Sequence, residues 1–196
     1  VYIDPYFLQT LPSREFGAGV AEIIKMAVCF DREFFTYLQN HTLNLQDTQS
    51  LVYAITQAVS IKARIVSSDE KEKGIRAALN YGHTFGHAIE NLTEYKRYLN
   101  GEAVSIGMCM ANALAYELGF LQADEMEAIK NLLEKYNLPT FFEVSDVLDF
   151  YEKFYLDKKS SDSKIMFILP KGLGDVALCE DVPRQKVLKI LSEFKK

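Results

Sequence analysis

The hydrophobic and polar positions of the chain repeat mainly with the period of an α-helix. Residues 14–38 are apolar almost all round in their first half, which is typical of a buried helix. Residues 46–67 carry an apolar stripe at helical spacing, and further helices are predicted to begin near residue 80 and to cover residues 102–118, 123–139 and 145–156. Gly119, Pro139 and Ser145 supply a C-cap, a stop and an N-cap for these helices. The pattern predicts a mostly helical domain.

The period changes near the C-terminus. Residues 164–170 and 176–180 flank the glycine-containing stretch KGLGD, which predicts a small β-hairpin. Residues 182–196 then form a closing helix, with Pro183 near its first turn. At the other end, VYIDPYF is typical of the end of a strand followed by a turn. We therefore expect residues 1–13 to link from a preceding domain of a longer protein, and residues 14–196 to form the helical domain.

Composition narrows the function classes. The chain has 196 residues, of which 48% are hydrophobic, and it can bury a substantial core. The net charge of −5 argues against nucleic acid as a partner. The sequence has no long uncharged apolar run and no signal peptide, so no membrane partner is expected. Three cysteines stand far apart and are expected to be reduced thiols in a cytoplasmic protein.

Two of the three histidines, His83 and His87, lie one helical turn apart in the stretch LNYGHTFGHAIE. At this spacing both rings lean from the same face of a helix. The pair could be part of a metal site, a catalytic pair or two core histidines. A bare HxxxH pattern is a weak signal, but Gly82 and Gly86 remove side-chain bulk beside the rings and leave room for a ligand. A carboxylate from elsewhere would complete a plausible zinc set.

Several ionic residues occupy otherwise apolar helical positions. Lys62 lies within the apolar stripe of residues 46–67, where it either extends its head to water or meets an anion. Glu22 has apolar neighbours at helical spacing, and its carboxylate needs either Lys25 or a metal ion as a partner. Arg76 and Asn80 precede the histidine pair by about one turn. Such a set suits a pocket for a polyanionic small molecule.

Three other motifs have simpler interpretations. Glu102 lies at a predicted helix start, where its charge suits the positive end of the helix dipole. The DKK stretch at residues 157–159 is either a solvated charge run or a loop that places a lysine over a pocket. KGLGD lacks the strand and helix context of a nucleotide-binding loop, so it is a turn.

Together, the segments LQTLPSREFGAGVAEIIKMAVCFDREFF, IKARIVSSDEKEKGIRAALNYGHTFGHAIE and NGEAVSIGM resemble the C-terminal half of the 3-dehydroquinate synthase family. The resemblance implies the second, helical, metal- and substrate-binding domain of a two-domain α/β plus α enzyme. The first domain would bind most of the NAD. The implied reaction is a step of the shikimate pathway. It converts 3-deoxy-D-arabino-heptulosonate 7-phosphate to 3-dehydroquinate and phosphate, with catalytic NAD and zinc or cobalt. The family also tends to form homodimers.

The resemblance also implies residue roles. Glu22 and His83 match metal ligands. The matches to catalytic groups are His87, Lys25 and Lys62. The matches to substrate-binding groups are Arg76, Asn80 and one of Lys158 and Lys159. The segment that touches NAD matches Phe7, Leu8, Gln9 and Thr10.

One position departs from the family pattern. Asn100 stands where the family has a histidine that is the third metal ligand. An amide oxygen is a poorer zinc donor than imidazole, so we expect weakened metal affinity or a site completed by water. Because most of the NAD site is expected in the first domain, the isolated chain is predicted to be inactive. The alternatives are a related sugar-phosphate cyclase, a metal-dependent polyol dehydrogenase and a non-catalytic helical fragment.

Overall fold

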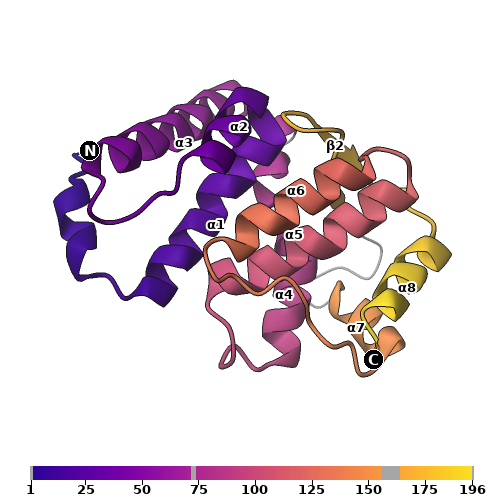
Figure 1. Ribbon diagram of the computed structural model, residues 1–196. Helices are drawn as coiled ribbons and strands as arrows, with labels where there is room; N and C mark the ends of the chain where they lie inside the picture. Colours follow the sequence, from indigo (N-terminus) through magenta and orange to yellow (C-terminus); the bar gives the residue numbers. More distant parts are fainter. Residues whose placement is uncertain (1, 72–73, 156–163, 196) are drawn as a thin grey trace.

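The computed structural model describes residues 2–71, 74–155 and 164–195. The described part of the chain is mostly helical, with one antiparallel β-hairpin near the C-terminus (Figure 1). The predicted fold class is therefore confirmed. The elements in chain order are the 3-10 helix η1 (Pro5–Thr10), α1 (Ser13–Phe30), α2 (Arg32–Asn40), α3 (Thr48–Ser68), the 3-10 helix η2 (Ile75–Asn80), α4 (His83–Leu92), α5 (Asn100–Glu117), α6 (Ala123–Glu134), α7 (Val147–Lys153), β1 (Phe167–Pro170), β2 (Val176–Cys179) and α8 (Arg184–Glu193).

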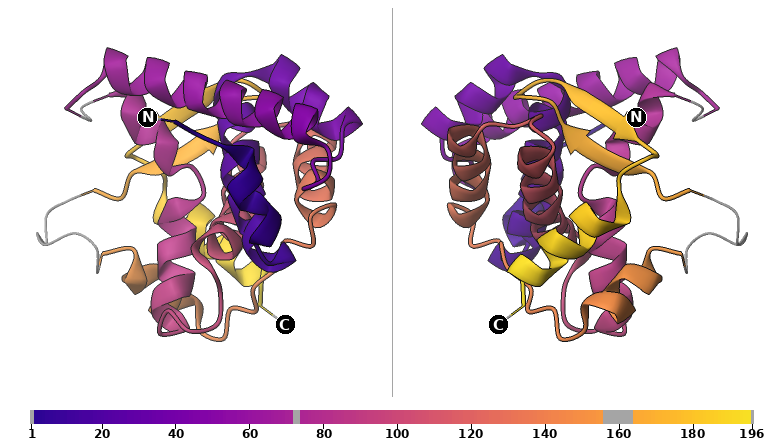
Figure 2. Two further views of the ribbon diagram at one scale, coloured as in Figure 1. Left: turned by 90° about the vertical axis from the view of Figure 1, so that its left-hand side faces the viewer. Right: turned by 90° about the vertical axis from the view of Figure 1, so that its right-hand side faces the viewer.

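Helix α5 is the centre of the fold. Most of its residues are buried, and it packs against α1, α4, α6 and α8 as well as β1. Its sequence, NGEAVSIGMCMANALAYE, is apolar on nearly every side, as a helix surrounded by neighbours requires. Figure 2 shows α3 lying across one end of the molecule and α7 and α8 at the other. The core is one continuous cluster of buried side chains from all these helices.

Glycines let α5 approach its neighbours backbone to backbone. A Cβ atom at Gly101 would lie closer than 3.0 Å to the Ala18 carbonyl of α1. A Cβ atom at Gly107 would lie equally close to the Gly82 carbonyl at the start of α4. Gly82 itself has a φ of +81°, which only glycine adopts without strain. These contacts fix the start of α4 and the middle of α1 against one helix.

The predicted helix over residues 14–38 is two helices, so its continuity was wrong. The chain is extended at Asp31, where φ is −157°, and the Asp31 carboxylate accepts a hydrogen bond from the Phe34 amide at 2.9 Å. This N-cap starts α2. The apolar run on both sides of Asp31 hid the break, because the two helices bury their faces in the same core.

Two other helix boundaries also differ from the prediction. Helix α6 ends at Glu134, well before Pro139, because the chain turns through Asn137 with a φ of +56°. Helix α7 is capped by Asp146, whose carboxylate accepts from two backbone amides, and Ser145 is not the N-cap. Gly119 is confirmed at the end of α5, with a left-handed φ of +77°.

Differences from the prediction also occur in the segments before α1 and α4. Residues 2–4 have no regular structure and are followed by η1, where a strand end and turn had been predicted. The Asp4 carboxylate accepts from the Tyr6 amide, and Pro5 favours a helical turn over a strand. The helix predicted from about residue 80 begins at His83, after η2 and the left-handed Gly82.

The hairpin is confirmed. Phe167 pairs with Cys179 and Pro170 with Val176, and the turn contains Gly172 and Gly174, both with positive φ. The three cysteines are free thiols. Within the described residues, no helix is both long enough and apolar enough to cross a membrane.

The close packing of α5 gives a direct test. Gly107→Ala should lower the free energy of unfolding by roughly 3 kcal/mol or more, because the new methyl group meets backbone atoms that cannot move aside. Gly19→Ala is the matched control, since no atom lies within 4 Å of a Cβ atom there. It should raise the free energy of unfolding by about 0.5–1 kcal/mol. Urea unfolding followed by circular dichroism measures both, and equal effects would contradict the packing described here.

Candidate functional site

The site begins at the first turns of α4. His83 and His87 lie on one face, as predicted, with ring centroids 5.4 Å apart and ring planes nearly perpendicular. Gly82 turns the chain into the helix, and the bare surface at Gly86 lets α5 lie close behind it. Because α5 packs against the glycines and each histidine follows one of them by about 100° of helix rotation, the two imidazoles project beside the face that meets α5.

Helix α1 brings Glu22 to His83. Glu22 Oε1 lies 4.0 Å from His83 Nε2, and Glu22 Oε2 lies 2.6 Å from Lys25 Nζ. Lys25 is therefore a partner of Glu22, as considered above. A metal ion is still compatible, because the ion pair with Lys25 occupies only one carboxylate oxygen. Glu22 Oε1 is buried and has no hydrogen-bond partner in the described part of the chain. Leaving such an oxygen without a donor or cation costs about 1–3 kcal/mol or more.

The His83 ring is neutral at physiological pH. Burial and, to a lesser extent, the nearby Lys25 ammonium lower the pKa of His83 to about 4, although Glu22 acts in the opposite direction. His83 Nδ1 lies 3.3 Å from the Tyr81 carbonyl, which can only accept, so Nδ1 carries the ring proton. The lone pair of Nε2 therefore faces Glu22 Oε1. Two electron-pair donors that face each other across 4.0 Å fit two ligands of a divalent cation.

Asn100, which the family resemblance places at the third-ligand position, is the first residue of α5. Its side chain is exposed, and Nδ2 donates to Glu90 Oε1 on α4 at 3.2 Å. Glu90 is buried. In residues 2–71, 74–155 and 164–195, no three His, Cys, Asp or Glu side chains are grouped to hold a metal ion. The structure therefore brings Glu22 and His83 together as a pair, while Asn100 serves as a hydrogen-bond donor to Glu90.

A cavity of about 500 Å³ opens beside the two histidines. Thr84 on α4 donates to the Met166 carbonyl at 3.1 Å and ties this helix to the segment before β1. The cavity walls thus come from η2, α4, α7 and the approach to the hairpin. The residues that line it are Ala77, Asn80, His83, Thr84, His87, Lys153, Phe154, Ile165, Met166 and Ile168.

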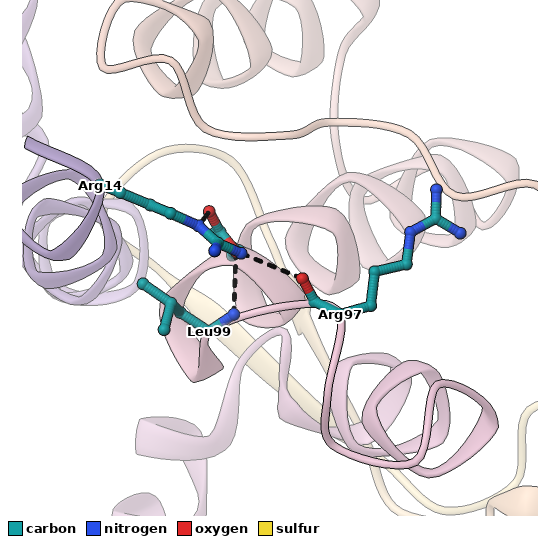
Figure 3. A network of polar contacts seen from close by, with 4 residues as sticks. Arg14, Arg97 and Leu99 are labelled. Atoms are coloured by element: carbon teal, nitrogen blue, oxygen red, sulfur yellow. Dashed lines mark hydrogen bonds and ion pairs between the residues drawn. The ribbon is translucent and has the colours of Figure 1, made fainter.

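A polar network holds the start of α5 in place (Figure 3). Arg14 of α1 donates two hydrogen bonds of 2.6 Å to the two oxygens of Glu102 and a third, of 3.0 Å, to the Arg97 carbonyl. The Leu99 amide donates to the same Glu102 carboxylate at 2.8 Å. Glu102 therefore caps α5, as its place at the helix start predicted, and also pairs with Arg14. This network fixes the turn that carries Asn100.

A known protein family matches most of the chain. The profile of the family described as 3-dehydroquinate synthase C-terminal matches residues 19–160. The chain belongs to the 3-dehydroquinate synthase family.

Over its full length it is 63% identical to the 3-dehydroquinate synthase of Helicobacter hepaticus and 55% identical to that of Nitratiruptor sp.. The chain spans 56% of the length of each of these curated relatives.

Solved structures of related enzymes have the same fold. A 2-epi-5-epi-valiolone synthase from Streptomyces hygroscopicus, solved with NAD+ and Zn2+ bound, aligns with a TM-score of 0.87 and 26% identity, over 98% of this chain and 54% of that one. A 2-deoxy-scyllo-inosose synthase, solved with carbaglucose-6-phosphate, NAD+ and Co2+, aligns with a TM-score of 0.78 and 25% identity, over 97% of this chain and 55% of that one.

The remaining residues expected from the family resemblance are less closely gathered. Arg76 lies on η2 with Asn80, and its guanidinium donates to the Glu70 carbonyl at 2.6 Å. Lys62 is exposed on α3 and is not among the residues that line the cavity. The segment Phe7–Thr10 lies in η1, which contacts α3, and only Leu8 is partly buried. Lys158 and Lys159 lie outside the described residues.

Sequence reasoning missed one charged residue of the cavity, Lys153. It lies at the end of α7, and its ammonium pairs with Asp149 at 3.1 Å. The side chain is 24% exposed. The only sequence signal for Lys153 was its i,i+4 spacing from Asp149. Such a pair is typical of any exposed helix face and does not indicate a binding site.

The pairing of Glu102 predicts a pH dependence of stability. The hydrogen bonds from Arg14 hold the pKa of Glu102 below its usual value of 4.5, although burial acts in the opposite direction. A carboxylate with a lowered pKa in the folded state stabilises the fold fully above the unfolded pKa, and that contribution is lost as the pH falls through the folded pKa. Glu102→Gln should therefore destabilise most at neutral pH and progressively less below about pH 4.5.

Urea unfolding at a series of pH values measures this difference. Glu143→Gln, at an exposed position, controls for the loss of one carboxylate. Parallel stability curves for the wild type and Glu102→Gln, with no convergence in acid, would contradict the assignment.

Proposed function

We propose that the chain is the metal- and substrate-binding half of a 3-dehydroquinate synthase. The whole enzyme would convert 3-deoxy-D-arabino-heptulosonate 7-phosphate to 3-dehydroquinate and phosphate. The observation that carries the proposal is the unpaired, buried Glu22 Oε1, which faces the lone pair of His83 beside a cavity that His87 and Asn80 also line. The relatives of known name at 51–63% identity support the same reaction.

Glu22 and His83 would hold a divalent cation, zinc or cobalt, with water or substrate oxygens completing the coordination. The Tyr81 carbonyl would keep the His83 tautomer correct for this task. When bound, the cation would polarise a substrate oxygen, and NAD would accept and return a hydride. The structural relatives that contain NAD+ with Zn2+ or Co2+ support this pair of cofactors.

The cations of the site would bind the phosphate and carboxylate of the substrate. Lys25 is 3% exposed and already balances Glu22, so it would contribute a fixed charge near the metal. Arg76 would supply a second cation from η2, and Lys62 a third from the surface of α3. Lys158 and Lys159 would add one phosphate contact. From the geometry, Lys153 joins this set, because it lines the cavity beside His83 and His87.

Three roles remain for the other predicted residues. His87 lines the cavity and would move a proton during the reaction, a role that the substrate's own phosphate could share. Asn80, in the same wall, would bind a substrate hydroxyl. Phe7, Leu8, Gln9 and Thr10 would touch NAD, whose site would otherwise lie in the other half of the enzyme.

The first prediction concerns turnover. The full-length protein should release phosphate from 3-deoxy-D-arabino-heptulosonate 7-phosphate in the presence of NAD and zinc or cobalt. The isolated chain should show no turnover under the same conditions, because most of the NAD site would be missing. Full-length activity on a rival sugar phosphate, but not on this substrate, would instead favour a related cyclase. Turnover by the isolated chain would refute the expectation that most of the NAD site lies in the other half of the enzyme.

The family resemblance also leads us to expect a homodimer, and sedimentation of the active protein tests this.

The second prediction concerns the metal. Asn100→His should tighten zinc binding by about ten- to a hundredfold, because it supplies the missing imidazole and Glu90 lies where a carboxylate could orient that ring. Competition with a chromophoric chelator measures the affinity without any need for turnover. Asn100→Gln is the control for a change of size and should not tighten binding. Adding Glu90→Gln to Asn100→His should remove much of the gain, and unchanged affinity in Asn100→His would count against the proposed ligand set.

A further inference from the structure

A second cavity, of about 540 Å³, lies between α5, α6 and the end of α8. None of the described residues that line it also lines the cavity beside the histidines. Its floor is on α5, where Cys109, Asn112 and Ala113 contribute. Nothing in the proposed reaction uses this cavity, so the residues that line it need a separate explanation.

The floor holds a buried hydrogen-bond donor without a partner. Asn112 is 1% exposed, and its Oδ1 accepts a hydrogen bond from the Tyr81 hydroxyl. Burial raises the pKa of Tyr81 well above its usual value, so this hydroxyl stays protonated and donates. The other end of the amide, Nδ2, is buried and has no partner among the described residues. Because buried amide donors are nearly always paired, this group indicates a missing acceptor.

The wall of the cavity is apolar and aromatic. Phe141 and Phe194 stack with ring centroids 5.5 Å apart and planes 16° from parallel. Met126 on α6 lines the same space. Phe141 is 43% exposed, so aromatic surface borders the cavity.

The rim is acidic. Among the described residues, Glu127, Glu134 and Glu193 line the cavity together with one cation, Lys130. Lys130 lies 3.9 Å from Glu134, so this pair is largely balanced. No ion pair is recorded for Glu127 in the part of the chain that the structure describes. The rim therefore favours a cation over an anion.

We propose that this cavity binds a small organic ammonium compound with an apolar ring and an oxygen acceptor at opposite ends. The acceptor would reach Asn112 Nδ2, the ring would pack against Met126 and the Phe141–Phe194 stack, and the ammonium group would lie near Glu127 and Glu193. The three requirements come from three different parts of the cavity. The site does not depend on the proposed enzyme reaction.

Three probes separate these requirements in a binding experiment on the wild-type chain. Tyramine has the hydroxyl acceptor, the ring and the ammonium group. Phenethylamine lacks the acceptor and should bind about fivefold more weakly, as the loss of one neutral hydrogen bond implies. Para-hydroxyphenylpropionate has the same shape with the opposite charge and should bind at least tenfold more weakly. Titrations followed by the side-chain amide signal of Asn112 in a nitrogen–proton NMR spectrum locate each probe.

Two variants test the assignment of the groups. Asn112→Leu should abolish the difference between tyramine and phenethylamine, because no donor remains for the hydroxyl. Glu127→Lys, on the exposed rim, leaves the core intact and should weaken tyramine at least tenfold while it strengthens the carboxylate probe. Glu152→Lys, an exposed position that does not line this cavity, controls for the change in net charge. Equal affinity for all three probes, or no shift of the Asn112 signal at millimolar tyramine, would overturn the proposal and leave a buried water as the partner of Asn112.

Discussion

The close contact of α5 with its neighbours is the constraint on which the rest of the structure depends. Gly101 and Gly107 have no side chain, so the backbones of α1 and α4 come within a distance that any Cβ atom would prevent. Because backbone atoms cannot rotate away as side chains can, this packing sets the positions of both helices. The short separation between Glu22 and His83 follows from that packing, since each residue lies within about one turn of such a contact.

The electrostatics of the site depend on the same arrangement. Burial keeps His83 neutral, so it does not form an ion pair with Glu22. Instead, two electron-pair donors, His83 Nε2 and Glu22 Oε1, lie close together. Lys25 balances the charge of Glu22 without occupying both of its oxygens. If the proposed cation binds here, the fold would pre-organise its site, because the two donors are already held close together. Asn100 donates a hydrogen bond to Glu90, so in the ligand set proposed above only Glu22 and His83 would be strong ligands.

The sequence predicted most of this fold because helical periodicity and turn residues are local signals. The hairpin and the ends of α5 were recognisable for this reason. The break at Asp31 was not, because both flanking helices bury apolar faces and the pattern runs through it. In the site, the spacing of His83 and His87 is local and was predicted from the chain itself. The contact with Glu22 is not local, and only the family resemblance suggested it; Lys153 had no signal that distinguishes it from a surface lysine.

Tyr81 joins the two cavities. Its carbonyl lies against His83 Nδ1, and its hydroxyl donates to Asn112 Oδ1, so one buried residue orients a side chain in each site. In the described residues, the two buried side-chain atoms without a hydrogen-bond partner are Glu22 Oε1 and Asn112 Nδ2. Glu22 Oε1 lies next to His83, whose ring contacts the Tyr81 carbonyl, and Nδ2 belongs to Asn112, which accepts from the Tyr81 hydroxyl. An unpaired buried polar atom is costly, so each of the two atoms supports the ligand proposed for its site, and Tyr81 orients a neighbouring group in both.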